Sequence, residues 1–212
     1  MKLFSACLLA AACVLPFSSI AAPLDDAIAE LQRDWEVIRY QTPESARQKR
    51  FEALSVKAHN ISQAFAGHSE PLVWEGIIVS SLANEKGGLG ALSLAKQAKA
   101  MYEQAIALRG DALDGSAYGS LAVLYYKVPG WPLGFGDKAK AEELLKKALS
   151  VNPTGIDPNY FYADYLVETG RSAEAAPYLE RALAAPPRPG REVADTGRRD
   201  EVRQLLAKLK AL

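Results

Sequence analysis

The sequence predicts an all-α fold, in which antiparallel helix pairs stack into an α-solenoid. Apolar residues recur at three- and four-residue steps through most of the chain after residue 22, which is the pattern of amphipathic helices. No alternating run of β-branched residues bounded by turns competes with that pattern. In the second half of the chain, two segments repeat each other at an interval of 34 residues, which indicates a repeat architecture.

Residues 1–21 are predicted to be a signal peptide and not part of the fold. Lys2 precedes an apolar stretch, and Ser19, Ile20 and Ala21 form a small-residue cleavage site. We therefore expect export and a periplasmic location. Two alternatives keep the protein on a membrane: the segment stays uncleaved as an anchor, since about 20 apolar residues span a bilayer, or Cys13 carries a lipid.

Cysteine usage and charge exclude several classes of function. Both cysteines, Cys7 and Cys13, lie in the predicted signal peptide, so the mature chain has no disulfide, thiol nucleophile or cysteine zinc ligand. Lysine plus arginine and aspartate plus glutamate balance at 25 each. Because no net charge favours nucleic acid or an anionic membrane, we expect no nucleic-acid partner.

Three helices are predicted at the start of the mature chain, over about residues 24–40, 43–65 and 69–85. Thr42 and Ser69 are expected to be the N-caps of the second and third helices. Each is a hydroxyl residue directly before a first turn that contains proline. The first two helices would form a degenerate pair at the start of the array.

The repeat is clearest between residues 136–153 and residues 170–187. The matched positions, each 34 residues apart, are Gly136/Gly170, Ala141/Ala175, Leu145/Leu179, Ala148/Ala182, Leu149/Leu183 and Pro153/Pro187. Alanine at such positions lets two helices cross closely, and leucine fills the space beside the crossing. The predicted domain therefore covers residues 22–212, with repeats at 114–153 and 157–187, a weaker one at 70–109, and a capping helix at about 195–211.

A seven-residue insertion interrupts the first of these repeats. The helices that precede the repeated segments also match, but at 41 residues: Tyr118/Asn159, Leu121/Tyr162, Ala122/Ala163 and Tyr125/Leu166. The difference between 41 and 34 places the insertion between Tyr125 and Gly136, in the stretch KVPGWPLGFGD. Asp137, at the end of this stretch, belongs to the repeat and is the expected N-cap of the next helix.

The period and the small-residue positions resemble the tetratricopeptide repeat, a helix-turn-helix unit. More narrowly, the segments LYYKVPGWPLGFGDKAKAEELLKKAL, NPTGIDPNYFYADYL and APPRPGREVADTGRRDE resemble exported bacterial proteins similar to the T-component of TRAP transporters. That resemblance implies a periplasmic helper that associates with the substrate-binding subunit of a solute importer.

In such an array the first helix of each pair lines a concave groove. The candidate groove residues are Tyr126, Lys127, Asp157, Tyr160, Asp164 and Glu168. Aromatic and charged side chains together suit a protein or peptide partner. A structural role is the alternative for each: Asp157 is more simply the N-cap of its helix, Tyr160 packs on a neighbour, and both readings stay open for Tyr126 and Asp164.

Two further segments have two interpretations each. In the insertion, Trp131 and Phe135 either fold back to plug the end of the helix pair or form a rigid aromatic binding surface at the rim of the groove. Near the C-terminus, residues 188–201 alternate arginines with acids. We expect a solvated, salt-bridged segment that wraps around the fold, with a patch for an anionic partner as the alternative.

No motif predicts catalysis, a bound metal or a cofactor. His59 and His68 lack an HExxH pattern, there is no G-x-S-x-G elbow, and GFGDK lacks the spacing of a phosphate loop. We predict a protein-binding scaffold that is not an enzyme, with a homo-oligomer left open. The alternative is a helical protein that holds a small, partly apolar ligand in the groove or in a pocket between helices.

Overall fold

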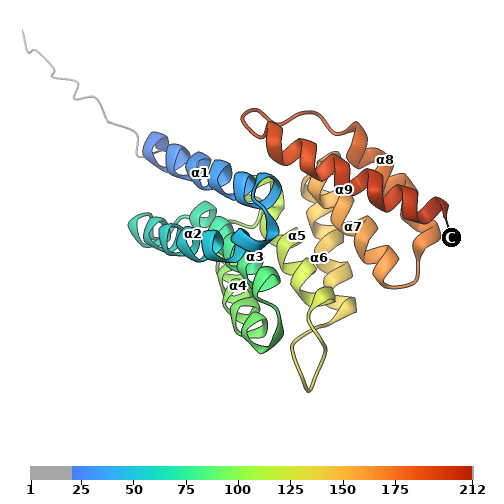
Figure 1. Ribbon diagram of the computed structural model, residues 1–212, viewed down its shortest axis with the longest axis horizontal. Helices are drawn as coiled ribbons and strands as arrows, with labels where there is room; N and C mark the ends of the chain where they lie inside the picture. The colour runs from blue at the N-terminus through green and yellow to red at the C-terminus, as the bar shows by residue number, and fades with distance from the viewer. Residues whose placement is uncertain (1–20, 212) are drawn as a thin grey trace, which may run out of the picture.

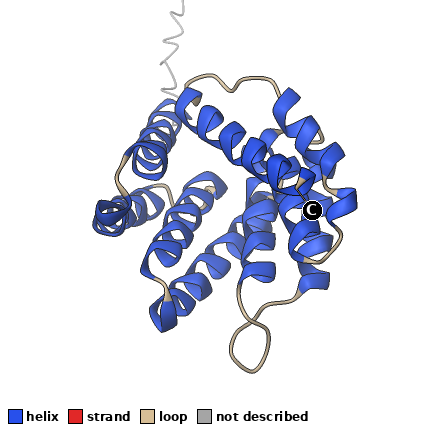
Figure 2. Cartoon of the chain, turned by 45° about the vertical axis from the view of Figure 1, so that its right-hand side comes forward, coloured by secondary structure: helices blue, strands red, loops and turns tan. Residues whose placement is uncertain are grey.

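The computed structural model describes residues 21–211, which form helices and loops without any strand (Figures 1 and 2). The predicted signal peptide lies outside the described residues except for Ala21, the first residue of α1. The elements are α1 (Ala21–Glu36), the π-helix η1 (Val37–Gln41), α2 (Glu44–Ala64), α3 (Ser69–Lys86), α4 (Gly88–Arg109), α5 (Ala112–Lys127), α6 (Lys138–Val151), α7 (Ile156–Glu168), the 3-10 helix η2 (Ser172–Glu174), α8 (Ala176–Ala184) and α9 (Glu192–Lys210).

The helices stack as antiparallel pairs, so the predicted fold class, an all-α solenoid, is confirmed. Each odd-numbered helix packs against the helix that follows it, and α1, α3, α5, α7 and α9 also pack against one another in chain order. These first helices form one layer, and the even-numbered helices form the other. Among the described helices, none is long and apolar enough to span a membrane.

The positions predicted at helix crossings are buried. Ala141, Ala163, Ala175 and Ala182 have no exposed surface, and the leucines at 145, 166 and 179 are equally closed off. A small side chain at the crossing and a large one beside it allow close packing without a void. The core forms two clusters, one within α1–α3 and a larger one from α3 to α9.

Helix starts follow the sequence signals only in part. Asp137 is the N-cap of α6, as predicted, because its carboxylate accepts a hydrogen bond of 3.0 Å from the Lys140 amide. Thr42 and Ser69 are not caps. The Thr42 hydroxyl donates to the Val37 carbonyl at 3.1 Å, at the base of the π-helix, and the Ser69 hydroxyl donates to carbonyl oxygens at the end of α4. Tertiary acceptors have replaced the local amides.

The insertion forms a loop, residues 128–137, that projects from the body between α5 and α6 (Figure 1). We call it the aromatic loop. Its base is closed by a hydrogen bond of 2.8 Å from the Asp137 amide to the Tyr125 carbonyl. The next pair has the equivalent bond, 2.7 Å from the Arg171 amide to the Leu166 carbonyl. The seven extra residues therefore lie inside a turn that both repeats close in the same way.

Removing the insertion should leave the fold intact. Deleting residues 129–135 leaves four residues between Tyr125 and Asp137, as between Leu166 and Arg171. We expect an unchanged helical circular dichroism spectrum and a change in unfolding free energy below about 2 kcal/mol. Shortening the loop alters its closure entropy by only about 1 kcal/mol. Urea unfolding measures the difference, and loss of a cooperative transition would contradict the assignment of these residues as an insertion.

Candidate functional site

Four of the predicted groove residues meet at the C-terminal ends of α5 and α7. The Tyr126 hydroxyl donates to Asp164 Oδ2 at 2.7 Å, and Lys127 Nζ lies 3.0 Å from the same oxygen and 2.7 Å from Glu168 Oε1. Tyr126 is buried, whereas Lys127 and Glu168 are nearly half exposed. Burial, with the adjacent Asp164 charge, raises the pKa of Tyr126 well above its usual value, so the phenol remains a donor. This polar cluster forms an accessible charged rim.

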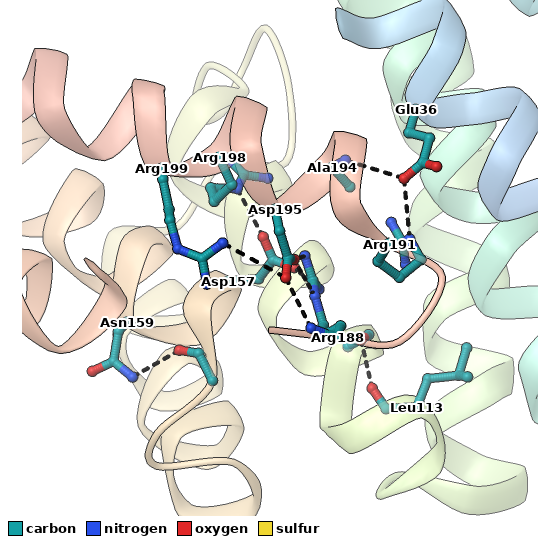
Figure 3. Close-up of polar contacts among 12 residues, drawn as sticks. Glu36, Leu113, Asp157, Asn159, Arg188, Arg191, Ala194, Asp195, Arg198 and Arg199 are labelled. Carbon is teal, nitrogen blue, oxygen red and sulfur yellow. Dashed lines mark hydrogen bonds and ion pairs between the residues drawn. The ribbon is translucent and has the colours of Figure 1, made fainter. Parts of the chain in front are cut away.

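The other two, Asp157 and Tyr160, lie at the start of α7 and are covered by α9. Asp157 accepts hydrogen bonds of 2.7 Å from both Arg188 Nη1 and Arg198 Nε, and the Arg198 guanidinium lies 4.5 Å from the centre of the Tyr160 ring (Figure 3). The interpretation of Asp157 as an N-cap is wrong. Helix α7 begins at Ile156 with Gly155 before it, and no side chain caps it.

Asp157 belongs to a chain of ion pairs that links α7, α9 and η1 (Figure 3). Together with the pair Glu36–Arg191 we call it the arginine network. Its members are Arg39, Arg188, Arg191, Arg198 and Arg199 with Glu36, Asp157, Asp195 and Glu201. The expectation of a salt-bridged segment wrapping around the fold is correct, but that of a solvated one is wrong. Asp195 is only 2% exposed, because the segment packs between α7 and α1.

The arginines decide the charge state of Asp157. Burial raises the pKa of this carboxyl, but the charges of Arg198 and Arg188 and the hydrogen bond from Arg188 outweigh burial and hold the pKa far below its usual value. In the opposite direction, Asp157 and Glu201 help to raise the pKa of Arg198 despite its burial. The pairs are therefore fully charged at neutral pH.

The network reaches the first helix through Glu36, at the end of α1. Glu36 is 5% exposed. Its Oε2 accepts a hydrogen bond of 3.1 Å from the Ala194 amide in the first turn of α9 and lies 3.5 Å from Arg191 Nε (Figure 3). Ala194 itself packs in the hydrophobic cluster of α1–α3. The start of α9 therefore joins the two ends of the helical array.

A cavity of about 470 Å³ lies beneath this junction. Its wall consists of the first helices α1, α3, α5 and α7, with the segment from Pro186 to Arg198 across it. The apolar wall includes Trp35, Trp74, Ile77, Leu113 and Phe161, and the polar wall includes Asn152, Asp157, Arg188, Arg191 and Arg198. We call it the concave cavity. Its size is that of a pocket for a small molecule.

The aromatic loop separates its two aromatic residues. Trp131 is 90% exposed and Leu133 is 73% exposed, so the plug interpretation fails for Trp131. Phe135 packs edge-on against Tyr125, with ring centres 5.8 Å apart, and Lys99 Nζ lies 5.9 Å from its ring centre. Phe135 therefore anchors the base of the loop, and the tip remains in solvent.

Sequence reasoning missed most residues of the concave cavity. Trp35 and Trp74 show only the helical spacing of core residues. Leu113, Asp114 and Gly115 take three consecutive left-handed backbone conformations, with φ values of 49°, 56° and 74°. The Asp-Gly pair is a turn signal, but nothing local predicts a left-handed leucine. Among the described residues, no cluster of three or more His, Cys, Asp or Glu side chains is arranged to hold a metal ion.

The stacked pairs and the layer of first helices define a helical-repeat protein of the kind that presents a concave face for binding. Residues 133–209, which cover α6 to α9, match the family model of the tetratricopeptide repeat. This match supports membership of the tetratricopeptide-repeat superfamily, whose domains commonly bind protein partners and are generally non-catalytic scaffolds. A search of curated proteins finds no match to the chain.

The pairing of Asp157 should make a large contribution to stability. Asp157→Asn leaves Arg188 and Arg198 without a charged partner in a site where Asp157 is only 31% exposed. We expect a loss of about 2–4 kcal/mol in unfolding free energy at pH 7, measured by urea unfolding. Asp200→Asn, which breaks an exposed pair on the same helix, is the control and should cost under about 1 kcal/mol. Equal losses would contradict this role of the arginine network.

The same pairing makes stability depend on pH. The folded-state pKa of Asp157 lies below the value of about 4 in an unfolded chain. Its contribution is therefore fully present above about pH 4 and is lost as the pH falls toward the folded-state pKa. Between pH 7 and pH 3, the wild-type protein should lose more unfolding free energy than Asp157→Asn. Parallel curves for the two proteins would show that Asp157 does not govern this acid sensitivity.

Proposed function

We propose that the protein is an exported tetratricopeptide-repeat adaptor that binds a protein partner in the periplasm. The apolar segment over residues 1–21 supports export, and the helical-repeat fold supports protein binding. The resemblance to the T-component of TRAP transporters favours one partner, the substrate-binding subunit of a solute importer. The proposed role is that of an accessory component of the importer.

The aromatic loop carries the proposal. Its tip holds Trp131 and Leu133 in water, where large apolar side chains gain nothing for the fold. Main-chain hydrogen bonds hold the loop in shape, among them one of 2.9 Å from the Gly136 amide to the Pro129 carbonyl. A shaped loop loses little conformational entropy when it binds, and tryptophan is the residue type most enriched at the energetic centre of interfaces.

The polar cluster supplies the second part of the proposed surface. Lys127 is the last residue of α5, directly before the aromatic loop, and with Glu168 it offers both signs of charge beside the base of the loop. Charged groups around an apolar centre set the orientation of a partner more than its affinity. The start of α7 contributes nothing to this surface, because α9 covers Asp157 and Tyr160.

Replacing the two exposed loop residues should weaken binding without affecting stability. We expect the double variant Trp131→Ser/Leu133→Ser to bind the purified substrate-binding subunit of a TRAP-type importer from the same organism at least tenfold more weakly than wild type, about 1.4 kcal/mol. Isothermal titration calorimetry measures the affinity. The melting temperature should not change, since both side chains are exposed.

Leu89→Ser is the matched control, because Leu89 is 92% exposed but lies at the start of α4. It should bind like wild type. The deletion of residues 129–135 should bind as weakly as the double variant. Full binding by that deletion would place the interface elsewhere, and absence of binding by the wild-type protein would refute the importer partner. Self-association through the loop would appear as a dimer in sedimentation of wild type that the deletion abolishes.

Export can be tested independently. Residues 1–22 fused to alkaline phosphatase, which is active only after export, should give an active periplasmic enzyme. Replacing Leu8 and Leu9 with arginine should abolish that activity, since it breaks the apolar stretch. N-terminal sequencing of the exported protein should begin at Ala22. An inactive fusion, or a product that retains Cys13 with a lipid, would refute the predicted cleavage.

A further inference from the structure

Two buried nitrogen donors on the walls of the concave cavity have no acceptor. Three buried side-chain polar atoms without a hydrogen-bond partner are found among residues 21–211, and two of them are Trp74 Nε1 and Arg191 Nε. Both of these side chains line the cavity. An unsatisfied buried donor costs about 1–3 kcal/mol, and more when it is charged. Two such donors at one cavity indicate that the site lacks an acceptor that belongs there.

Arg191 is also the least well paired arginine of the network. Arg188 and Arg198 each contact two carboxylates at 2.6–2.7 Å. Within the described chain, the one ion pair of Arg191 is with Glu36 at 3.5 Å, and the same Glu36 oxygen already accepts from the Ala194 amide. Its side chain is only 12% exposed. A buried guanidinium with one distant partner is a site for a second anion.

The charge of the whole network agrees with this. Its five arginines face four carboxylates, so one positive charge is uncompensated. Burial, followed by the charge of Arg188, lowers the pKa of Arg191, which identifies Arg191 as the member that bears the excess. An anion with a single charge would neutralise the site.

The rest of the cavity is suited to a flat apolar group. The Arg191 guanidinium lies 5.1 Å from the centre of the Trp74 ring, and Trp35 meets Trp74 edge to face at 6.1 Å. Phe161, Ile77 and Leu113 complete the apolar wall. Aromatic walls favour an aromatic guest through edge and face contacts. The volume of about 470 Å³ corresponds to about 15 water molecules, which is too small for a folded partner.

The backbone at the cavity is strained. Leu113 and Asp114 are left-handed, and each left-handed residue other than glycine costs about 1–2 kcal/mol. Both residues line the cavity. Strained backbone of this kind persists where the surrounding structure enforces it, and it concentrates at ligand sites. The strain adds to the two unsatisfied donors and the excess charge as a third feature of the same cavity.

We propose that the concave cavity binds a small aromatic carboxylate. The carboxylate binds the guanidinium of Arg191, beside the unsatisfied Trp74 donor, and the ring of the ligand packs against Trp74, Trp35 and Phe161. This site is separate from the aromatic loop and does not require a protein partner. It makes the protein a sensor or carrier of an organic anion in addition to a scaffold.

A pair of ligands that differ in charge alone tests the proposal on the wild-type protein. We would titrate the chain from Ala22 onward with 3-phenylpropionate and with its neutral amide, 3-phenylpropionamide, at pH 7 in a calorimeter. The acid should bind at least tenfold more tightly than the amide. No binding of the acid at millimolar concentration, or equal affinity for the two compounds, would overturn the proposal. Hexanoate, with a chain in place of the ring, should bind more weakly; equal affinity would refute the preference for an aromatic group.

Two variants locate the site. Arg191→Gln should lose at least tenfold in affinity for 3-phenylpropionate, and Trp74→Phe, which keeps a ring but removes the donor, should also bind more weakly. Arg203→Gln is the matched control, because Arg203 is an arginine of α9 whose side chain is 60% exposed; it should bind like wild type. Unchanged affinity in Arg191→Gln would overturn the assignment. If that variant does not fold, the acid and amide comparison still decides.

The two proposals can fail separately. Trp131→Ser/Leu133→Ser should bind 3-phenylpropionate normally, since the aromatic loop lies outside the cavity wall. Arg191→Gln, if folded, should bind the importer subunit normally in the absence of the ligand. Weaker ligand binding by the loop variant would contradict the separation of the two sites.

Discussion

The contact on which the rest of the structure depends is the one that the first turn of α9 makes with α7 and α1. Asp157 of α7 is held between two arginines at 2.7 Å, and Glu36 of α1 accepts from the Ala194 amide. A helical-repeat array gains its stability from neighbouring units, and its two ends normally do not meet. Here buried polar contacts join them, so breaking one partner leaves charges without solvent or counter-ion.

This junction determines which surfaces are open. It covers the start of α7, so the groove residues there serve the fold. The ends of α5 and α7 remain accessible, beside the aromatic loop that carries Trp131 into solvent. The junction also forms one wall of the concave cavity. A surface for a protein and a pocket for a small anion therefore lie in different parts of the molecule, and ligand binding at Arg191 would act on the element that joins the two ends of the array.

Much of the fold was predictable because helical packing is periodic. The 34-residue interval located the crossings at Ala141 and Ala175, which are buried, and the comparison with 41 located the aromatic loop. Helix caps were less predictable. Asp137 caps α6, but Thr42 and Ser69 bond to acceptors that the sequence does not place near them. A hydroxyl has several candidate acceptors, and only the folded chain decides among them.

The sequence by itself determined the helices, their pairing and the place of the insertion, since each depends on residues within one repeat. Tertiary structure alone decided how the arginine-rich segment is used. Its alternating charges predict ion pairs but not their partners, because Asp157 and Glu36 lie 31 to 158 residues away from the groups they bond. The concave cavity is likewise tertiary. Its walls come from α1, α3, α5, α7 and α9, and the missing acceptor of Arg191 becomes visible only when these helices are assembled.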